Sequence, residues 1–336
     1  MSDGTVGPEE MGSLLARAGL ERDVVRVQPL GGGVSSDVHD VMTTTDRLVV
    51  KVALPRLKVA EDWFASVSRA VVERRALGLA GRWTPHHVPE VVGWDDDGLL
   101  VLRHLGDDVV PWKPAILASH VHPTTGPELA RLLATWQEHG AEGAESLGDQ
   151  AVQNFDELRT GPFYRTVAAR MPDVAAEISH LIQDAAARQE CLVHGDYSPK
   201  NIMVGTRTVV LDWEVAHLGD PAYDAGFLAC HLLLKSIVRP RSEVEAALDG
   251  FTTTLDLLRS NLDWERVWRH AGALLLARVV GKSPVDYLSP EQTDRAAALG
   301  RALLLSPPET AVPCARLKRG VATSVPDRLD TDRPPA

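Results

Sequence analysis

The hydrophobic periodicity of the chain changes once, close to residue 105, and this change most limits what the chain can fold into. Before that point, alternating or β-branched runs at residues 24–30, 36–54 and 87–105 are broken by GGG at 31–33 and by DDDG at 95–98. Alternation predicts strands, and the Gly- and Asp-rich breaks predict tight turns between them. One apolar pattern with helical spacing, at residues 62–83, interrupts these strands.

After residue 105 the apolar residues recur mostly at helical spacing, with two short strands expected near residues 192–211. The expected helical segments are residues 126–140, 172–190, 226–238, 242–260, 263–281 and 290–305. The sequence therefore predicts an α+β, two-lobed protein. We expect a β-rich first lobe at 1–104, a larger helical lobe at 105–305, and a Pro- and charge-rich disordered tail at 306–336. A ligand site is expected where two such lobes meet.

Composition narrows the classes of partner. The chain has 336 residues, 44% of them hydrophobic, and a formal net charge of -11, which argues against a nucleic-acid partner. The amino terminus lacks the pattern of a secretory signal, and we expect no membrane span because no uninterrupted apolar run reaches membrane-spanning length. The three Cys lie far apart and show no metal-ligand spacing. These features predict a cytoplasmic protein.

The stretch LVHGDYSPKNIMVGTRTVVLDWE, at residues 192–214, concentrates acidic and amide side chains around a strand signal. Asn201 follows Asp196 by five residues, which is the spacing of a kinase catalytic loop, where the Asp accepts a hydroxyl proton and the Asn holds a metal ion. The apolar runs NIMV and TVVL predict a hairpin that brings Asp212 to the same place. One amide and one or two carboxylates suit Mg²⁺, which also takes phosphate oxygens.

The first lobe contains residues suited to binding phosphate. Backbone N–H groups of Gly31, Gly32 and Gly33 could approach phosphate oxygens closely, and Ser35 and Ser36 could add hydroxyl donors.

Lys51 lies in the apolar strand RLVVKVAL, where burial of an unpaired ammonium group is costly, so it needs an anionic partner. Glu73, in the following helix, can supply that partner. A Lys–Glu pair of this kind positions nucleotide phosphates in kinases.

Together, HGDxxxxN at 194–201 and DWE at 212–214 resemble the motifs of the aminoglycoside phosphotransferase and choline kinase type of small-molecule kinase. Within that group the layout is most similar to methylthioribose kinases, over roughly residues 25–305. The segments that carry the likeness are VKVALPRLKVAEDW, TPHHVPEVVGWD, DWEVAHLGDPAYDAG and the stretch from RHAGALLLARVVG to RALLL.

The resemblance implies a protein-kinase-like fold, with ATP or GTP as co-substrate and Mg²⁺ as the metal. It implies Asp196 as catalytic base and Asn201 and Asp212 as metal ligands, with Glu214 as a further acid at the metal. His194 would brace the catalytic loop. The backbone of Arg103, His104 and Leu105 would contact adenine.

Several residues depart from the methylthioribose kinases. Those enzymes carry paired arginines where this chain has Ala277 followed by Arg278, so that only Arg278 remains as a candidate substrate contact. Trp213 replaces their Pro between the two acids, and the loop DYSPKN is closer to that of antibiotic and amino-sugar kinases.

We therefore expect a phosphotransferase that acts on a hydroxyl group of a sugar-containing small molecule, either an antibiotic of aminoglycoside or nucleoside type or, as the alternative, a metabolic sugar such as methylthioribose. A catalytically inactive nucleotide-binding protein is the third possibility. A homodimer is compatible with the resemblance.

Overall fold

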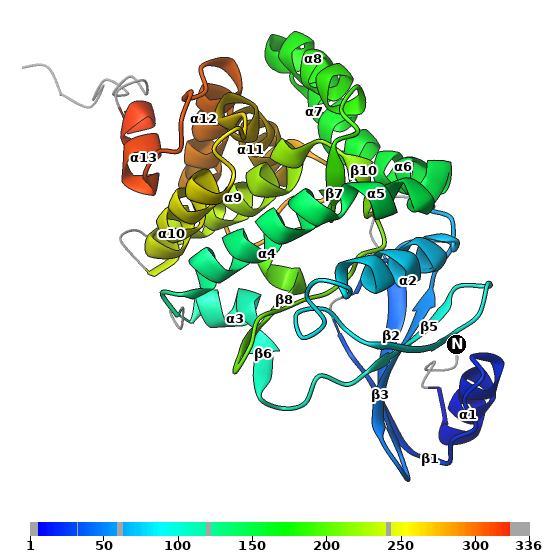
Figure 1. Cartoon of the computed structure of the whole chain (residues 1–336). Coiled ribbons are helices and arrows are strands. Elements are labelled where there is room, and N and C mark those ends of the chain that lie inside the picture. The colour runs from blue at the N-terminus through cyan, green and yellow to red at the C-terminus, as the bar shows by residue number, and fades with distance from the viewer. Residues whose placement is uncertain (1–5, 32, 59–62, 119–121, 240–242, 323–336) are drawn as a thin grey trace, which may run out of the picture.

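The computed structural model describes residues 6–31, 33–58, 63–118, 122–239 and 243–322, with side chains up to 318. An antiparallel sheet and two helices form the first part of the chain, and a larger helical assembly forms the rest (Figure 1). The predicted α+β class with a β-rich first lobe is confirmed.

The sheet of the first lobe has the strand order β1-β2-β3-β5-β4 and is antiparallel throughout. Its strands are β1 (Val24–Pro29), β2 (Ser36–Thr43), β3 (Arg47–Ala53), β4 (Val91–Trp94) and β5 (Leu99–Arg103).

Both faces of this sheet are covered. On β5, Leu99 and Val101 share a hydrophobic cluster with residues of α1 (Pro8–Arg17), whereas Leu100 and Leu102 join the larger core on the side of α2 (Arg69–Ala80). Because successive side chains of a strand point to opposite faces, one strand can anchor a helix on each side. Helix α2 lies between the sheet and the helical lobe (Figure 1).

The helical lobe also contains two small antiparallel sheets, β10-β7 and β6-β8-β9, which support the loops of the site. Its strands are β6 (Val109–Pro111), β7 (Cys191–Val193), β8 (Ile202–Gly205), β9 (Val209–Val210) and β10 (His217–Gly219). Its helices are α3 (Trp112–Leu117), α4 (Thr125–His139), α5 (Ala141–Ala144), α6 (Gly148–Phe155), a π-helix (Asp156–Arg165), α7 (Thr166–Arg170), α8 (Ala175–Ala186), α9 (Pro221–Val238), α10 (Glu243–Leu258), α11 (Trp264–Val280), α12 (Pro290–Leu305) and α13 (Cys314–Ala322), together with short 3₁₀ turns at Glu145–Leu147, Pro172–Val174 and Pro199–Asn201.

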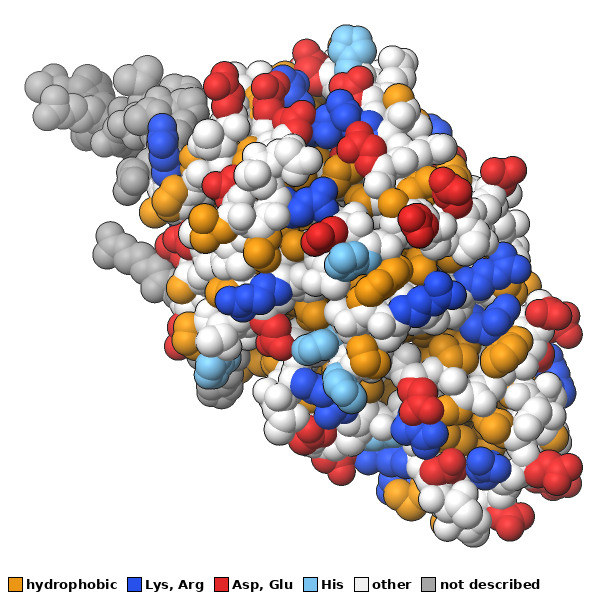
Figure 2. Space-filling view, viewed as in Figure 1, with side chains coloured by type: hydrophobic (Ala, Val, Ile, Leu, Met, Phe, Trp, Pro, Cys, Tyr) orange, Lys and Arg blue, Asp and Glu red, His pale blue; other side chains and the backbone are white. Residues whose placement is uncertain are grey.

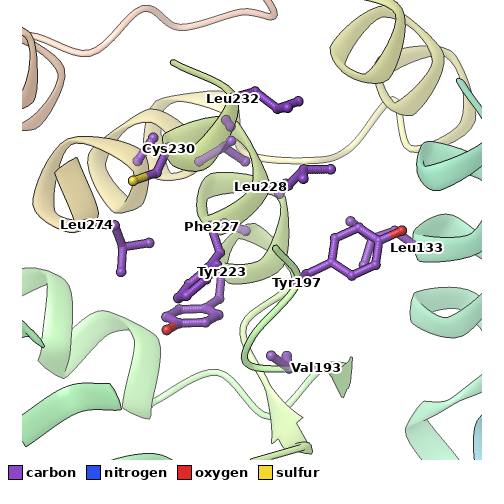
Figure 3. Packing of buried hydrophobic residues seen from close by; sticks show 14 of the residues in the cluster. Leu133, Val193, Tyr197, Tyr223, Phe227, Leu228, Cys230, Leu232 and Leu274 are labelled. Carbon is purple, nitrogen blue, oxygen red and sulfur yellow. The ribbon is translucent and has the colours of Figure 1, made fainter. Parts of the chain in front are cut away.

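Helix α9 forms the centre of the helical lobe, and it is buried from Pro221 to Ile237. Figure 3 shows its apolar side chains between Leu274 of α11 and the side chains of Val193 and Tyr197, which belong to β7 and the loop that follows it. A helix that is apolar all round belongs in the interior of a domain. Helices α4, α10, α11 and α12 pack around this core.

The prediction of a disordered tail at 306–336 was wrong for its first part. Cys314–Ala322 forms α13, and Val312, Cys314 and Leu317 are buried against the helical lobe. These few apolar residues are spaced so that one face of a short helix covers the neighbouring core, although Pro and charged residues dominate the composition. Residues 323–336 lie outside the described ranges.

The described helices include none with the length and apolarity of a membrane span. On the face shown in Figure 2, acidic and basic side chains are interspersed with apolar ones.

Candidate functional site

The segment that carries the predicted catalytic loop runs from β7 through a loop into the 3₁₀ turn Pro199–Asn201 and then β8. His194 is buried, and both of its ring nitrogens bind backbone groups: Nε2 lies 2.9 Å from the Leu211 carbonyl oxygen, and Nδ1 accepts from the Asp196 N–H at 3.0 Å. This pattern requires the neutral ring protonated at Nε2, and burial lowers the pKa of His194 to about 4. His194 therefore braces the loop.

Gly195 and Asp224 fix the turn of the same loop. Gly195 adopts φ +80°, and an added Cβ atom would lie 2.8 Å from the Val215 carbonyl oxygen, so the position requires glycine. Asp224, in the first turn of α9, accepts the backbone N–H groups of His194 and Gly195 at 2.7 and 2.9 Å. Burial raises the pKa of Asp224 to about 7.

Asp196, the predicted catalytic base, is buried between two cations. Its Oδ2 atom lies 2.8 Å from Nη2 of Arg159, on the π-helix, and 2.7 Å from Nζ of Lys200. Burial favours the neutral acid, but the charges of Arg159 and Lys200 outweigh it, and the pKa of Asp196 lies below its usual value. The carboxylate is thus ionised and held by ion pairs with two cations.

Asn201 is held by the loop that it follows. Its Nδ2 atom donates to the Asp196 carbonyl oxygen at 3.0 Å, and its own carbonyl oxygen accepts from the Leu211 N–H at 2.8 Å. The second contact connects the catalytic loop directly to the segment that carries Asp212.

Lys51, on β3, joins the two lobes. Its ammonium group donates to both carboxylate oxygens of Glu73, on α2, at 2.7 Å and to Asp212 at 2.9 Å. Burial lowers the pKa of Lys51, but the two carboxylates outweigh it and hold the group protonated. The predicted pair of Lys51 with Glu73 is thus present, and Asp212 completes a triad across the lobes.

Asp212 has φ +66° and is the one described non-glycine residue with positive φ. A non-glycine residue in this region costs about 1 kcal/mol or more of backbone strain, and such strain is concentrated at functional sites. Burial raises the pKa of Asp212, but the charges of Lys51 and Lys200 hold it well below its usual range. The backbone at this position directs an ionised carboxylate toward Lys51.

The donor set of Asn201 and Asp212 fits a magnesium ion that is shared with a nucleotide. One amide oxygen and one ionised carboxylate are the few hard oxygen ligands that Mg²⁺ takes from protein when phosphates supply more. Among the described residues, no three His, Cys, Asp or Glu side chains are grouped to hold a metal without such help. The assignment of these two residues as ligands stays a prediction.

Glu214, the predicted further acid at the metal, is bound by a cation from the other lobe. Its Oε2 atom accepts from Nε of Arg69, on α2, at 3.0 Å, and both side chains are almost completely buried. Arg69 also donates to the backbone carbonyl groups of Ser66 and Leu54 at 2.7 and 2.8 Å, and to that of Ser35. Glu214 therefore helps to hold the lobes together, and its role at a metal stays a prediction.

The glycine-rich turn connects β1 to β2, as predicted from the sequence. Gly31 and Gly33 are exposed there, whereas Gly32 lies outside the described residues. Ser35 and Ser36 are buried at the start of β2, and the Ser35 carbonyl oxygen accepts from the Leu54 N–H and from Arg69. Their contact with phosphate stays a prediction.

The predicted adenine-binding backbone follows β5. The N–H groups of Arg103 and His104 are used within the first lobe, bonding to carbonyl groups of Glu90 and Arg47 at 2.9 and 3.1 Å. The Leu105 carbonyl oxygen accepts from Arg207 at 2.8 Å. Adenine contact by this segment stays a prediction.

Arg278, the candidate substrate contact, lies on α11, close enough to Asp196 for that carboxylate to favour its charged form. Its Nη1 atom donates to the Ser283 hydroxyl group at 3.0 Å. Sequence patterns did not single out Arg69 or Arg159 as members of this site. Arg69 does precede Glu73 by four residues, which is the spacing that places two side chains on one helix face.

Comparison with known families matches most of the chain. The model of the phosphotransferase enzyme family matches residues 26–267. This range includes Lys51, Glu73, Asp196, Asn201 and Asp212.

Curated relatives include methylthioribose kinases, which confirms the likeness noted in the sequence. Methylthioribose kinase 2 of Oryza sativa subsp. japonica is 28% identical over 254 residues, covering 66% of this chain and 59% of that protein. Methylthioribose kinase of Geobacillus kaustophilus is 25% identical over 290 residues, covering 76% and 72%. The chain thus spans about three fifths of the length of the rice enzyme.

Solved structures share the fold at low identity. The macrolide 2'-phosphotransferase of Brachybacterium faecium aligns with a TM-score of 0.50 and 19% identity, covering 90% of this chain and all of that one. An aminoglycoside 2'-phosphotransferase-IIIa, solved as a GDP complex, aligns with a TM-score of 0.50 and 15% identity, covering 95% and 98%. The two-lobed protein-kinase-like fold expected from the motifs is confirmed.

Proposed function

Because the chain belongs to the phosphotransferase enzyme family, we propose that it is a small-molecule kinase that transfers the γ-phosphoryl group of ATP or GTP to a hydroxyl group of a sugar-containing acceptor. The observation that carries this proposal is the convergence across the lobes of the triad Lys51, Glu73 and Asp212 with the loop of Asp196 and Asn201. A phosphoryl-transfer site needs these parts in this arrangement.

In the proposed reaction, the acceptor oxygen forms a bond to the γ-phosphorus as the bond from that phosphorus to the β–γ bridging oxygen breaks. Asp196 orients the hydroxyl group and takes its proton, and the nucleoside diphosphate leaves. Because Arg159 and Lys200 hold the Asp196 carboxylate ionised, the base is ready in the ground state. The same contacts fix its position.

Lys51 would hold the α and β phosphates, and Glu73 and Asp212 keep its ammonium group protonated and in place. A Mg²⁺ ion held by Asn201 and Asp212 would neutralise charge on the phosphates. Most of the rate acceleration would then come from positioning and from fixed charges, as in other phosphoryl transfers.

Two classes of acceptor are proposed. An antibiotic acceptor draws support from the loop DYSPKN and from the shared fold of antibiotic phosphotransferases. A metabolic sugar of the methylthioribose type draws support from the curated relatives, although Ala277 replaces the first of the paired arginines. The third possibility, an inactive nucleotide-binding protein, is disfavoured because all five residues named above are retained.

The direct test is NTP turnover by the purified chain with Mg²⁺ across a panel of aminoglycosides, nucleoside antibiotics, methylthioribose and choline. Turnover that depends on one acceptor supports a kinase and identifies its class. Nucleotide binding with no turnover above background, and no further loss in an Asp196→Asn variant, would favour the inactive protein.

Replacement of Lys51 by Met should reduce kcat/KM for the nucleotide by about 10²–10³-fold, because it removes a fixed positive charge from the phosphates. Initial rates measured over a range of nucleotide concentrations check this. Lys282→Met, which removes an exposed lysine, is the matched control and should leave kcat/KM unchanged. Equal activity of the Lys51→Met protein, with folding verified by circular dichroism, would remove Lys51 from its proposed role.

A further inference from the structure

Two cationic side chains, the buried Lys235 and the partly buried Arg278, lie in the helical lobe near the loop of Asp196. Lys235 belongs to the buried helix α9 and is 2% exposed. Arg278, on the adjoining helix α11, is partly buried, with its Nε atom enclosed, and its charge acts on Lys235. Charged side chains are rarely this buried unless an anion accompanies them.

Within the described part of the chain, neither cation has an acidic partner. Lys235 Nζ donates to the carbonyl oxygen of His231 at 3.3 Å and lies 5.6 Å from the centre of the Tyr287 ring. Arg278 binds the Ser283 hydroxyl group, while its Nε atom is buried without a hydrogen-bond partner, as is the Tyr287 hydroxyl group. These unused donors belong to one group of neighbouring side chains.

The surroundings of this pair are also positive. Burial, then the charge of Lys113 at the start of α3 and that of Arg278, lower the pKa of Lys235 to about 7. The pKa of His231 is also lowered, first by burial and then by the charges of Lys235, Arg278, Lys200 and Lys113. We call Lys113, Lys200, Lys235 and Arg278 the cation cluster.

The cation cluster extends to the reacting groups. Lys200 forms an ion pair with Asp196, and α3, which carries Lys113, packs against the turn that contains Lys200. The negative charge of Asp196 also favours the charged form of Arg278. The charges of the cation cluster come from α3, the loop of Asp196, α9 and α11, which are far apart in sequence, yet Lys113, Lys200, Lys235 and Arg278 all lie close enough to His231 to lower its pKa.

We propose that the cation cluster binds an oxyanion, a carboxylate or a phosphate ester, carried by the acceptor whose hydroxyl group Asp196 activates. This inference rests on the proposed kinase function and specifies its substrate class. An oxyanion would accept from Lys235, Arg278 and the Tyr287 hydroxyl group, and would compensate for the cost of enclosing the Lys235 ammonium group and Arg278 Nε without an acidic partner.

Other acceptor charges fit the cluster less well. A neutral sugar could satisfy single hydrogen bonds but would leave the net positive charge uncompensated. A polycationic aminoglycoside or choline would add like charge beside Lys113, Lys235 and Arg278, and repulsion would oppose its binding. The cluster thus selects anionic acceptors over both classes.

The first test uses inorganic sulfate as an oxyanion probe. The thermal midpoint of the full chain is measured in saturating MgADP, with sodium sulfate or sodium chloride at equal ionic strength, for the wild type and for Lys235→Met, Arg278→Met and Arg131→Met. Arg131 is exposed on α4 and serves as the control. Sulfate should raise the midpoint more for the wild type and Arg131→Met than for the two cluster variants. An equal response in all four proteins would overturn the proposal.

The melting temperatures of the sulfate-free samples provide a second readout, because a variant that folds poorly would melt lower than the wild type, whereas the inference predicts that it melts higher. Near pH 7, Lys235→Met should melt at a higher temperature than the wild type, because it removes a buried cation without a counter-ion. The difference should shrink as pH rises from about 7 to about 10, because folding must neutralise Lys235 in this range and the cost of doing so falls as pH approaches the pKa of an unfolded lysine, about 10.4. A Lys235→Met protein that melts lower than wild type at every pH would contradict an unpaired buried charge.

The second test compares acceptors that differ in charge: glucose against glucuronate and glucose 6-phosphate, ribose against ribose 5-phosphate, and kanamycin and choline as cations. Acceptor-dependent turnover should occur with an anionic member, and Lys235→Met should lower its kcat/KM by about 10–100-fold. The sugar acids and the sugar phosphates distinguish the two oxyanion sources.

Turnover confined to neutral or cationic acceptors, and unaffected by Lys235→Met, would overturn the oxyanion inference while leaving the kinase intact. Conversely, absence of any turnover dependent on Asp196 would refute the kinase, whereas the sulfate response would still test the cluster.

Discussion

An Asp196→Asn protein should bind nucleotide as the wild type does and should turn over about 10²–10⁴-fold more slowly, which is the usual contribution of a positioned general base. Asparagine keeps the shape of the side chain but cannot take the proton of the acceptor hydroxyl group. The nucleotide groups are assigned to Lys51 and Asp212 instead, so the dissociation constant for MgADP should change by less than about twofold. Isothermal titration calorimetry and initial rates measure the two quantities separately.

The substitution also changes the electrostatics around Arg159. Its guanidinium group lies 2.8 Å from the Asp196 carboxylate and would lose that charge partner, so some loss of stability is expected. The unfolding midpoint must therefore be measured with the rates. Asp184→Asn, an exposed carboxylate on α8, is the control and should change neither activity nor stability. A rate near that of wild type in a folded Asp196→Asn protein would exclude Asp196 as the base.

The pH dependence offers an independent check on the same residue. Because Arg159 and Lys200 hold the pKa of Asp196 below its usual value, the base stays ionised throughout the range in which the protein is normally assayed. The acid limb of the kcat/KM profile should therefore lie below the usual carboxylate range. A limb above pH 5 that shifts in a Lys200→Met protein would assign Asp196 a higher pKa than the structure indicates.

The sequence was most informative where one local rule applied. The need of a buried ammonium group for a partner predicted the contact of Lys51 with Glu73, and the spacing from Asp196 to Asn201 placed both residues on one loop. Helical periodicity located α4 and α8 to α12 because each has an apolar face or is apolar all round. These rules depend on neighbours along the chain and need no knowledge of tertiary packing.

Other features depend on tertiary contacts and could not be predicted in this way. Arg159 lies on a π-helix that contains Pro162, a pattern without helical periodicity, and reaches Asp196 only through the folded chain. Lys235 stands near the end of an apolar helix, where a lysine would ordinarily extend into solvent. Only the packing of α11 and the segment of Tyr287 against α9 reveals that its ammonium group is enclosed. In α13, a few apolar residues outweigh a composition typical of disorder.

Replacement of Arg69 by Met should lower the free energy of unfolding by roughly 3–5 kcal/mol, because removing one partner leaves a buried charge uncompensated. Arg69 is 1% exposed and connects Glu214 of the helical lobe with backbone carbonyl groups of the first lobe. Urea unfolding of the full chain measures the loss. Arg75→Met removes an exposed arginine from the same helix and should cost less than about 0.5 kcal/mol.

A double-mutant cycle separates the two roles open to Glu214. If Glu214 serves mainly as the partner of Arg69, then Glu214→Gln and Arg69→Met should be non-additive, with a coupling energy of about 1–3 kcal/mol, and the Mg²⁺ concentration for half-maximal turnover should stay unchanged in Glu214→Gln. If Glu214 is a metal ligand, that concentration should rise severalfold in Glu214→Gln and not in Arg69→Met. Additive losses of stability would contradict the inter-lobe pair, whose 3.0 Å contact lies beside the triad that Lys51 forms with Glu73 and Asp212.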